Sequence, residues 1–133
     1  MSDRAVVLVA EDEPNLREPL VHLLRLRGFE VITAETATQA IDAMAPETPH
    51  AAIVDWHLKQ GTGSDVIERI PAATPVIVFS GSREGDRIGQ TRPSTRFVEK
   101  PCSLTWLIDT LNEMLGGSRP AIAQPLVVRA SAG

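Results

Sequence analysis

The sequence contains a single cysteine, Cys102, among its 133 residues. One cysteine excludes both a disulfide within the chain and a cysteine-based zinc site, so we expect Cys102 to fill a small buried space. No apolar run approaches the roughly 20 residues that a helix needs to cross a bilayer. The first residues, from Met1 to Arg4, also lack a signal-peptide pattern. These absences predict a cytoplasmic protein that makes no use of a membrane.

Clustered positive charge is also lacking. Lys and Arg number 13 against 17 Asp and Glu, which gives a net charge of −4, and no group of basic residues is visible. Because nucleic-acid binding depends on grouped Lys and Arg, we expect no nucleic-acid partner. About 17 residues follow the last helical pattern, too few for a helix-turn-helix module. A DNA-binding output domain is therefore not expected in this chain.

Short apolar runs alternate with helical patterns over residues 1–117, which we interpret as one domain. Strands are predicted at about 5–10, 30–34, 51–54, 75–79 and 96–99, and helices at about 15–27, 36–45, 64–70 and 103–116. Residues 83–95 contain two glycines and Pro93, so the fourth helix should be weak, short or partly unwound. Residues 118–133 are predicted to be a disordered tail, and the alternative is that its apolar patch, Leu126–Val128, pairs with a partner or a sheet edge.

The predicted fold is α/β, a doubly wound sheet of five parallel strands. Four of the strands lead into side chains that can do chemistry. In chain order these are Glu11 and Asp12, Asp55, Ser80, and Lys100. The second strand ends on Ala34 and Glu35 only, so it belongs at an outer edge, which predicts the flavodoxin-like order 2-1-3-4-5. Because parallel strands finish at the same edge of a sheet, we expect the reactive side chains to gather there.

The chemistry of this group points to a divalent cation and a phosphoryl group. Asp12 and Asp55 would repel each other at adjacent strand ends unless a cation lies between them. Hard oxygen ligands suit Mg²⁺, and Glu11 can add charge through a water. Asp55 could then act as a nucleophile towards phosphorus. The Lys100 ammonium and the Ser80 hydroxyl could neutralise the oxygens of the phosphoryl group during its transfer.

Across roughly residues 4–117 the chain resembles a receiver domain of the two-component response-regulator family, of the stand-alone type. The resemblance depends on four stretches, each at a predicted strand end: Leu8–Pro14, Ile53–Leu58, Val78–Gly81 and Phe97–Pro101. It implies that Asp55 is the phospho-acceptor and that Lys100 pairs with the phosphoryl group. It also implies that the Lys100–Pro101 peptide bond is cis, a conformation that proline makes accessible.

The resemblance implies further roles around Asp55. Mg²⁺ would be held by Glu11, Asp12 and Asp55 together with the backbone carbonyl of His57. Ser80 would be the switch hydroxyl and Phe97 the switch aromatic. Finally, His57 and Ser82, which lie two residues beyond Asp55 and Ser80, would modulate hydrolysis of the phosphorylated aspartate.

The predicted function is therefore that of a single-domain response regulator. It would accept a phosphoryl group from a phosphohistidine on a sensor histidine kinase or a histidine phosphotransfer protein. Phosphorylation would change its binding to a downstream protein, or the group would be passed on. We expect no enzymatic activity beyond self-catalysed phosphoryl transfer and autodephosphorylation.

Two alternatives come from other classes. A phosphorylation-independent scaffold with a receiver-like fold would bind partners without using Asp55, although all the key side chains are present. A haloacid-dehalogenase-type phosphatase would carry an Asp-x-Asp-x-Thr pattern after the first strand. The residues there are Glu11, Asp12, Glu13 and Pro14, which do not match that pattern.

Overall fold

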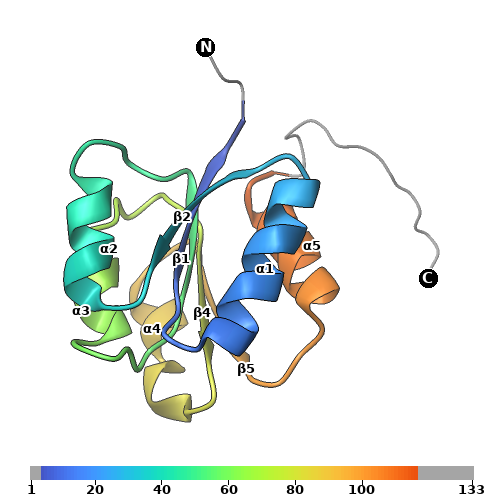
Figure 1. The fold of residues 1–133 in the computed structure, drawn as a ribbon. Helices are drawn as coiled ribbons and strands as arrows, with labels where there is room; N and C mark the ends of the chain where they lie inside the picture. The colour runs from blue at the N-terminus through green and yellow to red at the C-terminus, as the bar shows by residue number, and fades with distance from the viewer. Residues whose placement is uncertain (1–3, 117–133) are drawn as a thin grey trace.

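The computed structural model describes residues 4–116, so the predicted tail and its apolar patch lie outside the described residues. Five parallel strands form one sheet in the order β2-β1-β3-β4-β5, which confirms the predicted topology. The strands are β1 (Val6–Ala10), β2 (Glu30–Ala34), β3 (Ala51–Val54), β4 (Val76–Ser80) and β5 (Thr95–Glu99). All five run in one direction, and in Figure 1 they finish at the lower end of the molecule.

Helices cover both faces of the sheet. They are α1 (Pro14–Leu26), α2 (Ala37–Met44), α3 (Gly63–Ile67), α4 (Ile88–Thr91) and α5 (Leu104–Met114), with a 3₁₀ turn, η1 (Arg83–Gly85), before α4. Figure 1 shows α1 and α5 side by side on one face, and α2 and α3 on the other. Within residues 4–116 no helix has the length and apolar character needed to span a membrane. The result is a three-layer α/β domain.

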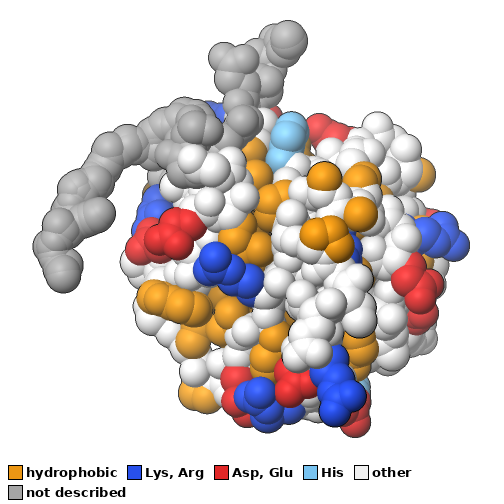
Figure 2. Space-filling view, turned by 180° about the vertical axis from the view of Figure 1, so that it is seen from behind, with side chains coloured by type: hydrophobic (Ala, Val, Ile, Leu, Met, Phe, Trp, Pro, Cys, Tyr) orange, Lys and Arg blue, Asp and Glu red, His pale blue; other side chains and the backbone are white. Residues whose placement is uncertain are grey.

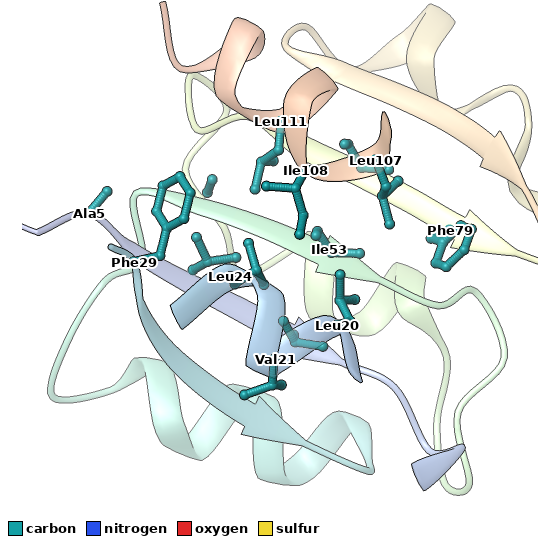
Figure 3. Close-up of a cluster of buried hydrophobic side chains, with 14 residues drawn as sticks. Ala5, Leu20, Val21, Leu24, Phe29, Ile53, Phe79, Leu107, Ile108 and Leu111 are labelled. Carbon is teal, nitrogen blue, oxygen red and sulfur yellow. The ribbon is translucent and has the colours of Figure 1, made fainter. Parts of the chain in front are cut away.

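Two hydrophobic clusters hold the layers together. Alternate residues of a strand point to opposite faces, so Val7 and Val9 of β1 pack in one cluster and Leu8 in the other. Figure 3 shows the first cluster, in which side chains of α1 and α5 meet those of the sheet. Because both faces are covered, β1, β3 and β4 consist of buried residues throughout. This explains why continuous apolar runs, and not alternating ones, predicted these strands.

Several predicted boundaries differ from the structure, and two of these differences concern Ser80 and the end of α3. Ser80 is the last residue of β4 and pairs with Glu99, whereas the sequence placed it just after the strand. Helix α3 ends at Ile67, three residues before the predicted end. The amides of Arg69 and Ile70 bond the carbonyl three residues back, at 3.0 Å, so the chain tightens into a turn of 3₁₀ type. The apolar pattern continues to Ile70 because that residue is still buried.

The segment between β4 and β5 is short, as predicted, and it is anchored to the rest of the domain. Its helical parts are η1 and the four residues of α4. The Arg92 guanidinium follows α4 and donates hydrogen bonds to the Pro71 carbonyl at 2.6 Å and to Thr95 Oγ1 at 2.7 Å. It also donates to the carbonyls of Ile70 and Thr74. Burial lowers the pKa of Arg92. One side chain thus connects α4 to the turn after α3.

Candidate functional site

The carboxyl edge of the sheet brings the predicted site residues to one end of the domain. Strands β1 and β3 are neighbours, with Ala10 opposite Val54. The amide of Asp55 donates to the Ala10 carbonyl at 2.9 Å, which continues the ladder by one residue and places Asp55 beside the end of β1. The Lys100 amide donates to the Ser80 carbonyl in the same way at the ends of β4 and β5. Strand register, a property of the sheet, therefore sets the position of each group.

Three carboxylates form a cluster at this edge. Glu11, Asp12 and Asp55 each offer one oxygen, and these oxygens all lie within 4.8 Å of one another. Glu11 and Asp55 are 3% and 7% exposed, and Asp12 is half-buried. Burying carboxylates this close together is costly unless positive charge is near. The cluster could hold a divalent cation that prefers oxygen ligands.

Lys100 supplies positive charge directly beside the cluster. Its Nζ lies 2.9 Å from Asp55 Oδ2 and 3.0 Å from Glu11 Oε1, and its side chain is 20% exposed. The same ammonium is 5.5 Å from the centre of the Phe79 ring. The Lys100–Pro101 peptide bond is cis, as the family resemblance implied. Lys100 thus bridges two of the three carboxylates.

Ionisation at the cluster follows from burial and from this bridge. Burial raises the pKa of Glu11, and the hydrogen bond from Lys100 opposes that rise without cancelling it. Burial alone would lower the pKa of Lys100, but its hydrogen bonds to Asp55 and Glu11 outweigh this and raise it. The ammonium is therefore held in its charged form by its two carboxylate partners.

The loop after Asp55 is shaped by a close backbone approach. Asp55 Oδ1 accepts from the amide of His57 at 3.2 Å, and the amide of Gly63 donates to the Trp56 carbonyl at 2.7 Å. A Cβ on Gly63 would lie 2.5 Å from the Asp55 carbonyl oxygen and 3.0 Å from the Trp56 Cα. Thr62 and Asp65 then begin α3 with a capping box. A residue without a side chain is needed where α3 begins against the loop after Asp55.

Gly63→Ala is accordingly expected to destabilise the domain by about 1–3 kcal/mol, because backbone must move to admit the methyl group. Urea unfolding measures this difference. Gly81→Ala is the matched control, since a Cβ on Gly81 would meet nothing within 4 Å. Equal losses in both variants would contradict the close approach at Gly63.

Ser80 and Phe97 lie on the neighbouring strands β4 and β5. Ser80 is 1% exposed, and its Oγ accepts from the amide of Ser82 at 3.2 Å. Phe97 is half-buried and lies opposite Val78, and the Arg83 guanidinium is 5.5 Å from the centre of its ring. Arg83 also bonds Glu99 of β5 at 3.0 Å. The two predicted switch residues therefore lie on paired strands, and Arg83 of η1 contacts the Phe97 ring.

His57 and Ser82, the predicted modulators of hydrolysis, take part in loop contacts. His57 is exposed, forms an isolated bridge with Thr62, and its Nε2 lies 2.8 Å from Glu84 Oε1. Ser82 is half-buried, and its Oγ accepts from the amide of Glu84 at 3.2 Å, which caps η1. Glu84 was not singled out by the sequence. Its place two residues after Ser82 is the one signal that could have suggested it.

The sequence also did not suggest a group of charged contacts near the carboxyl edge of the sheet. Arg17 donates to the Glu11 carbonyl at 2.9 Å and lies 3.4 Å from Glu35. Lys59 lies 3.2 Å from the same glutamate. Figure 2 shows charged side chains of both signs gathered at the lower end, where the strands of Figure 1 finish, with hydrophobic side chains along the middle of that face. Arg17, Glu35 and Lys59 thus form a group of paired charges next to Glu11.

Known proteins match this chain across most of its length. The family model for the response regulator receiver domain matches residues 7–112. The sensory/regulatory protein RpfC of Xanthomonas campestris pv. campestris is 32% identical over 122 residues, which cover 85% of this chain and 17% of that protein. The chain therefore spans only a small part of this relative.

Solved structures agree with the fold. The solution structure of the receiver domain of the PhyR response regulator from Erythrobacter litoralis has a TM-score of 0.74 and 30% identity, and the match covers 91% of this chain and 97% of that one. The receiver domain of the sensor histidine kinase PA1611 from Pseudomonas aeruginosa has a TM-score of 0.72 and 22% identity, with 85% and 98% covered. That crystal structure holds a magnesium ion coordinated in its active site cleft.

Proposed function

Because this chain belongs to the response regulator receiver domain family, we propose that it is a phosphorylation switch whose acceptor is Asp55. The observation that supports this most strongly is the position of the Lys100 ammonium, within 3.0 Å of oxygens of both Asp55 and Glu11, beside the three-carboxylate cluster. A nucleophilic carboxylate, a cation site and a fixed ammonium are the groups that transfer to an aspartate requires.

The carboxylate cluster fits Mg²⁺. Its donors are hard oxygens, two of them buried, and the PA1611 receiver domain holds that ion in its cleft. Glu11, Asp12, Asp55 and the backbone carbonyl of His57 would hold the ion. When bound, it would neutralise charge on the phosphoryl oxygens. Two positive centres, the metal and Lys100, would then flank Asp55.

In the proposed transfer, a carboxylate oxygen of Asp55 attacks the phosphorus of a phosphohistidine. The phosphorus–nitrogen bond breaks as the new phosphorus–oxygen bond forms, and its electron pair stays on the imidazole of the donor. The Lys100 ammonium and the Ser80 hydroxyl bind oxygens of the phosphoryl group. The donor would be a sensor histidine kinase or a histidine phosphotransfer protein, and a partner of this kind would support a cytoplasmic location.

Phosphorylation would then act on η1 and β5. Adding a dianionic group at Asp55 draws Ser80 inward through a new hydrogen bond, and Phe97 repacks towards the space left behind. The surface formed by residues 83–115 thereby changes its preference for a downstream protein, or the phosphoryl group passes to another acceptor. Later loss of the group by autodephosphorylation, modulated by His57 and Ser82, would reset the switch.

Asp12→Asn is expected to weaken Mg²⁺ binding by at least about tenfold, because it removes one charge from a site with few protein ligands. The fluorescence of Trp56, which adjoins Asp55, reports the titration in a Trp106→Phe background, where it is the one remaining tryptophan. Asp42→Asn, at an exposed position of α2, is the control. A fluorescence signal that does not respond to Mg²⁺ in the parent would contradict the proposed metal site.

A further inference from the structure

Two successive pairs of residues join the loop after Asp55 to η1. The Nε2 of His57 lies 2.8 Å from Glu84 Oε1. A Cβ on Gly85 would lie 2.5 Å from Trp56 Cε3, so the Gly85 backbone is packed directly against the indole ring. We call these two pairs, His57 with Glu84 and Trp56 with Gly85, the loop contact.

The loop contact lies beside the proposed acceptor. Strands β3 and β4 are neighbours, Asp55 follows the last residue of β3, and Ser80 is the last residue of β4. The two loops that leave these strand ends are the ones that meet. The loop contact therefore joins the two loops that leave the ends of β3 and β4, next to Asp55 in the chain and at the edge of the sheet where its carboxylate lies.

We propose that Glu84 is a positioning residue, which holds His57 against η1 and so keeps water away from the phosphorylated Asp55. The inference depends on the proposed function, since it concerns the lifetime of the phosphoryl group. Among residues 4–116, Glu84 is the charged partner of the His57 imidazole. The contact with Glu84 thus fixes the position of the His57 imidazole. Loss of either side chain would allow the loop after Asp55 and η1 to separate.

The step affected is hydrolysis. A water oxygen forms a bond to phosphorus as the bond between phosphorus and the Asp55 oxygen breaks, and the electron pair of that bond stays on the carboxylate. Both protons of the water leave with the phosphate, as dihydrogen phosphate. The attacking water needs room beside the phosphoryl group, and the loop contact limits that room on the β3–β4 side.

The expected effect is modest because the pair is exposed. The side chains of His57 and Glu84 are 53% and 66% exposed, and polar side-chain pairs at such exposed positions are weak. Glu84→Ala should therefore speed loss of the phosphoryl group by about two- to fivefold. His57→Ala should do the same, and the double variant should be no faster than either single one. Glu84→Gln retains an acceptor oxygen for His57 and should stay close to the parent.

The experiment loads the full chain with phosphoramidate and Mg²⁺, removes the donor, and follows release of inorganic phosphate. Glu47→Ala, an exposed change ahead of β3, is the matched control. In parallel, acrylamide quenching of Trp56 in the Trp106→Phe background shows whether Glu84→Ala opens the loop contact without phosphorylation. Increased quenching is expected, with no change in the control.

The outcomes separate this inference from the proposed function. A parent protein that is not labelled contradicts the proposed function and this inference with it. A labelled parent with an unchanged or slower rate in Glu84→Ala overturns the inference alone, as would additive effects in the double variant. Quenching that Glu84→Ala leaves unchanged would show that Glu84 does not hold the two loops together, and it would overturn the inference as well.

Discussion

Asp55→Asn is expected to abolish labelling by phosphoramidate or by a phosphorylated histidine phosphotransfer protein. An amide is a far weaker nucleophile than a carboxylate, so the bond to phosphorus is not formed. The variant should still fold, because an amide oxygen can accept from the His57 amide as Asp55 Oδ1 does at 3.2 Å. Mass spectrometry of the intact protein measures the result as the presence or absence of one added phosphoryl group.

Asp42→Asn on α2 is the control for this change and should be labelled like the parent. Retained labelling of Asp55→Asn would reject Asp55 as the acceptor. Pull-down of partners with and without beryllofluoride, a phosphoryl mimic, extends the experiment to binding. Partner binding that is insensitive to both beryllofluoride and Asp55→Asn would instead support a phosphorylation-independent scaffold.

Lys100→Met is expected to lower the free energy of unfolding near neutral pH by about 1–3 kcal/mol. Removing the ammonium leaves the buried carboxylates of Glu11 and Asp55 without their shared partner. The lower part of the range allows for the partial exposure of Lys100, 20% of its side chain. Urea unfolding of variant and parent measures the difference, and added Mg²⁺ should recover part of it in the variant.

The deficit of Lys100→Met should depend on pH. Burial already raises the pKa of Glu11, and the variant loses the Lys100 interactions that oppose this rise, so the pKa of Glu11 in the folded variant should be higher still. A carboxyl group with a raised pKa favours folding below its unfolded value and loses that contribution as the pH rises through its folded value. The deficit should therefore be smaller near pH 5 than near pH 7.5.

Lys59→Met is the matched control for this series. Lys59 also pairs with a glutamate, Glu35 at 3.2 Å, but its side chain is 61% exposed. Its loss should cost much less and should show little dependence on pH in this range. A deficit for Lys100→Met that is equal at both pH values would contradict the shared bridge between Glu11 and Asp55.

The sheet could be predicted closely because its central strands are buried on both faces. The predicted range for β3, Ala51–Val54, matches the structure, because this short run is wholly apolar and all of its residues are buried. The predicted range for β2 also matches, although this edge strand is only partly buried. Chain segments with weaker patterns were placed less well. Helix α3 ends earlier than predicted, because Ile70, although buried, lies in the turn that follows the helix. Local apolar pattern reports burial, not backbone conformation.

The contacts around η1 were beyond the sequence. Glu84 faces His57, Arg83 lies over Phe97, and Arg92 binds the turn after α3, yet each joins segments far apart in the chain. The residues next to an arginine or glutamate in a polar segment do not indicate which distant side chain it will contact. Residues 83–95, which the sequence predicted to be loose because of their two glycines and Pro93, are held by these long-range contacts.

The sequence alone indicated the order of the strands and the side chains at their ends, because apolar runs mark each strand and the second strand leads into Ala34 and Glu35 only. It placed Glu11, Asp12, Asp55, Ser80 and Lys100 at one edge on that basis alone. The sequence did not indicate that the Lys100 ammonium bridges Glu11 and Asp55, or that His57 is paired with Glu84; both contacts are seen in the folded domain. A charged side chain pairs with the oppositely charged group that lies nearest to it in space. Those distances are set only when the whole sheet and its loops have formed.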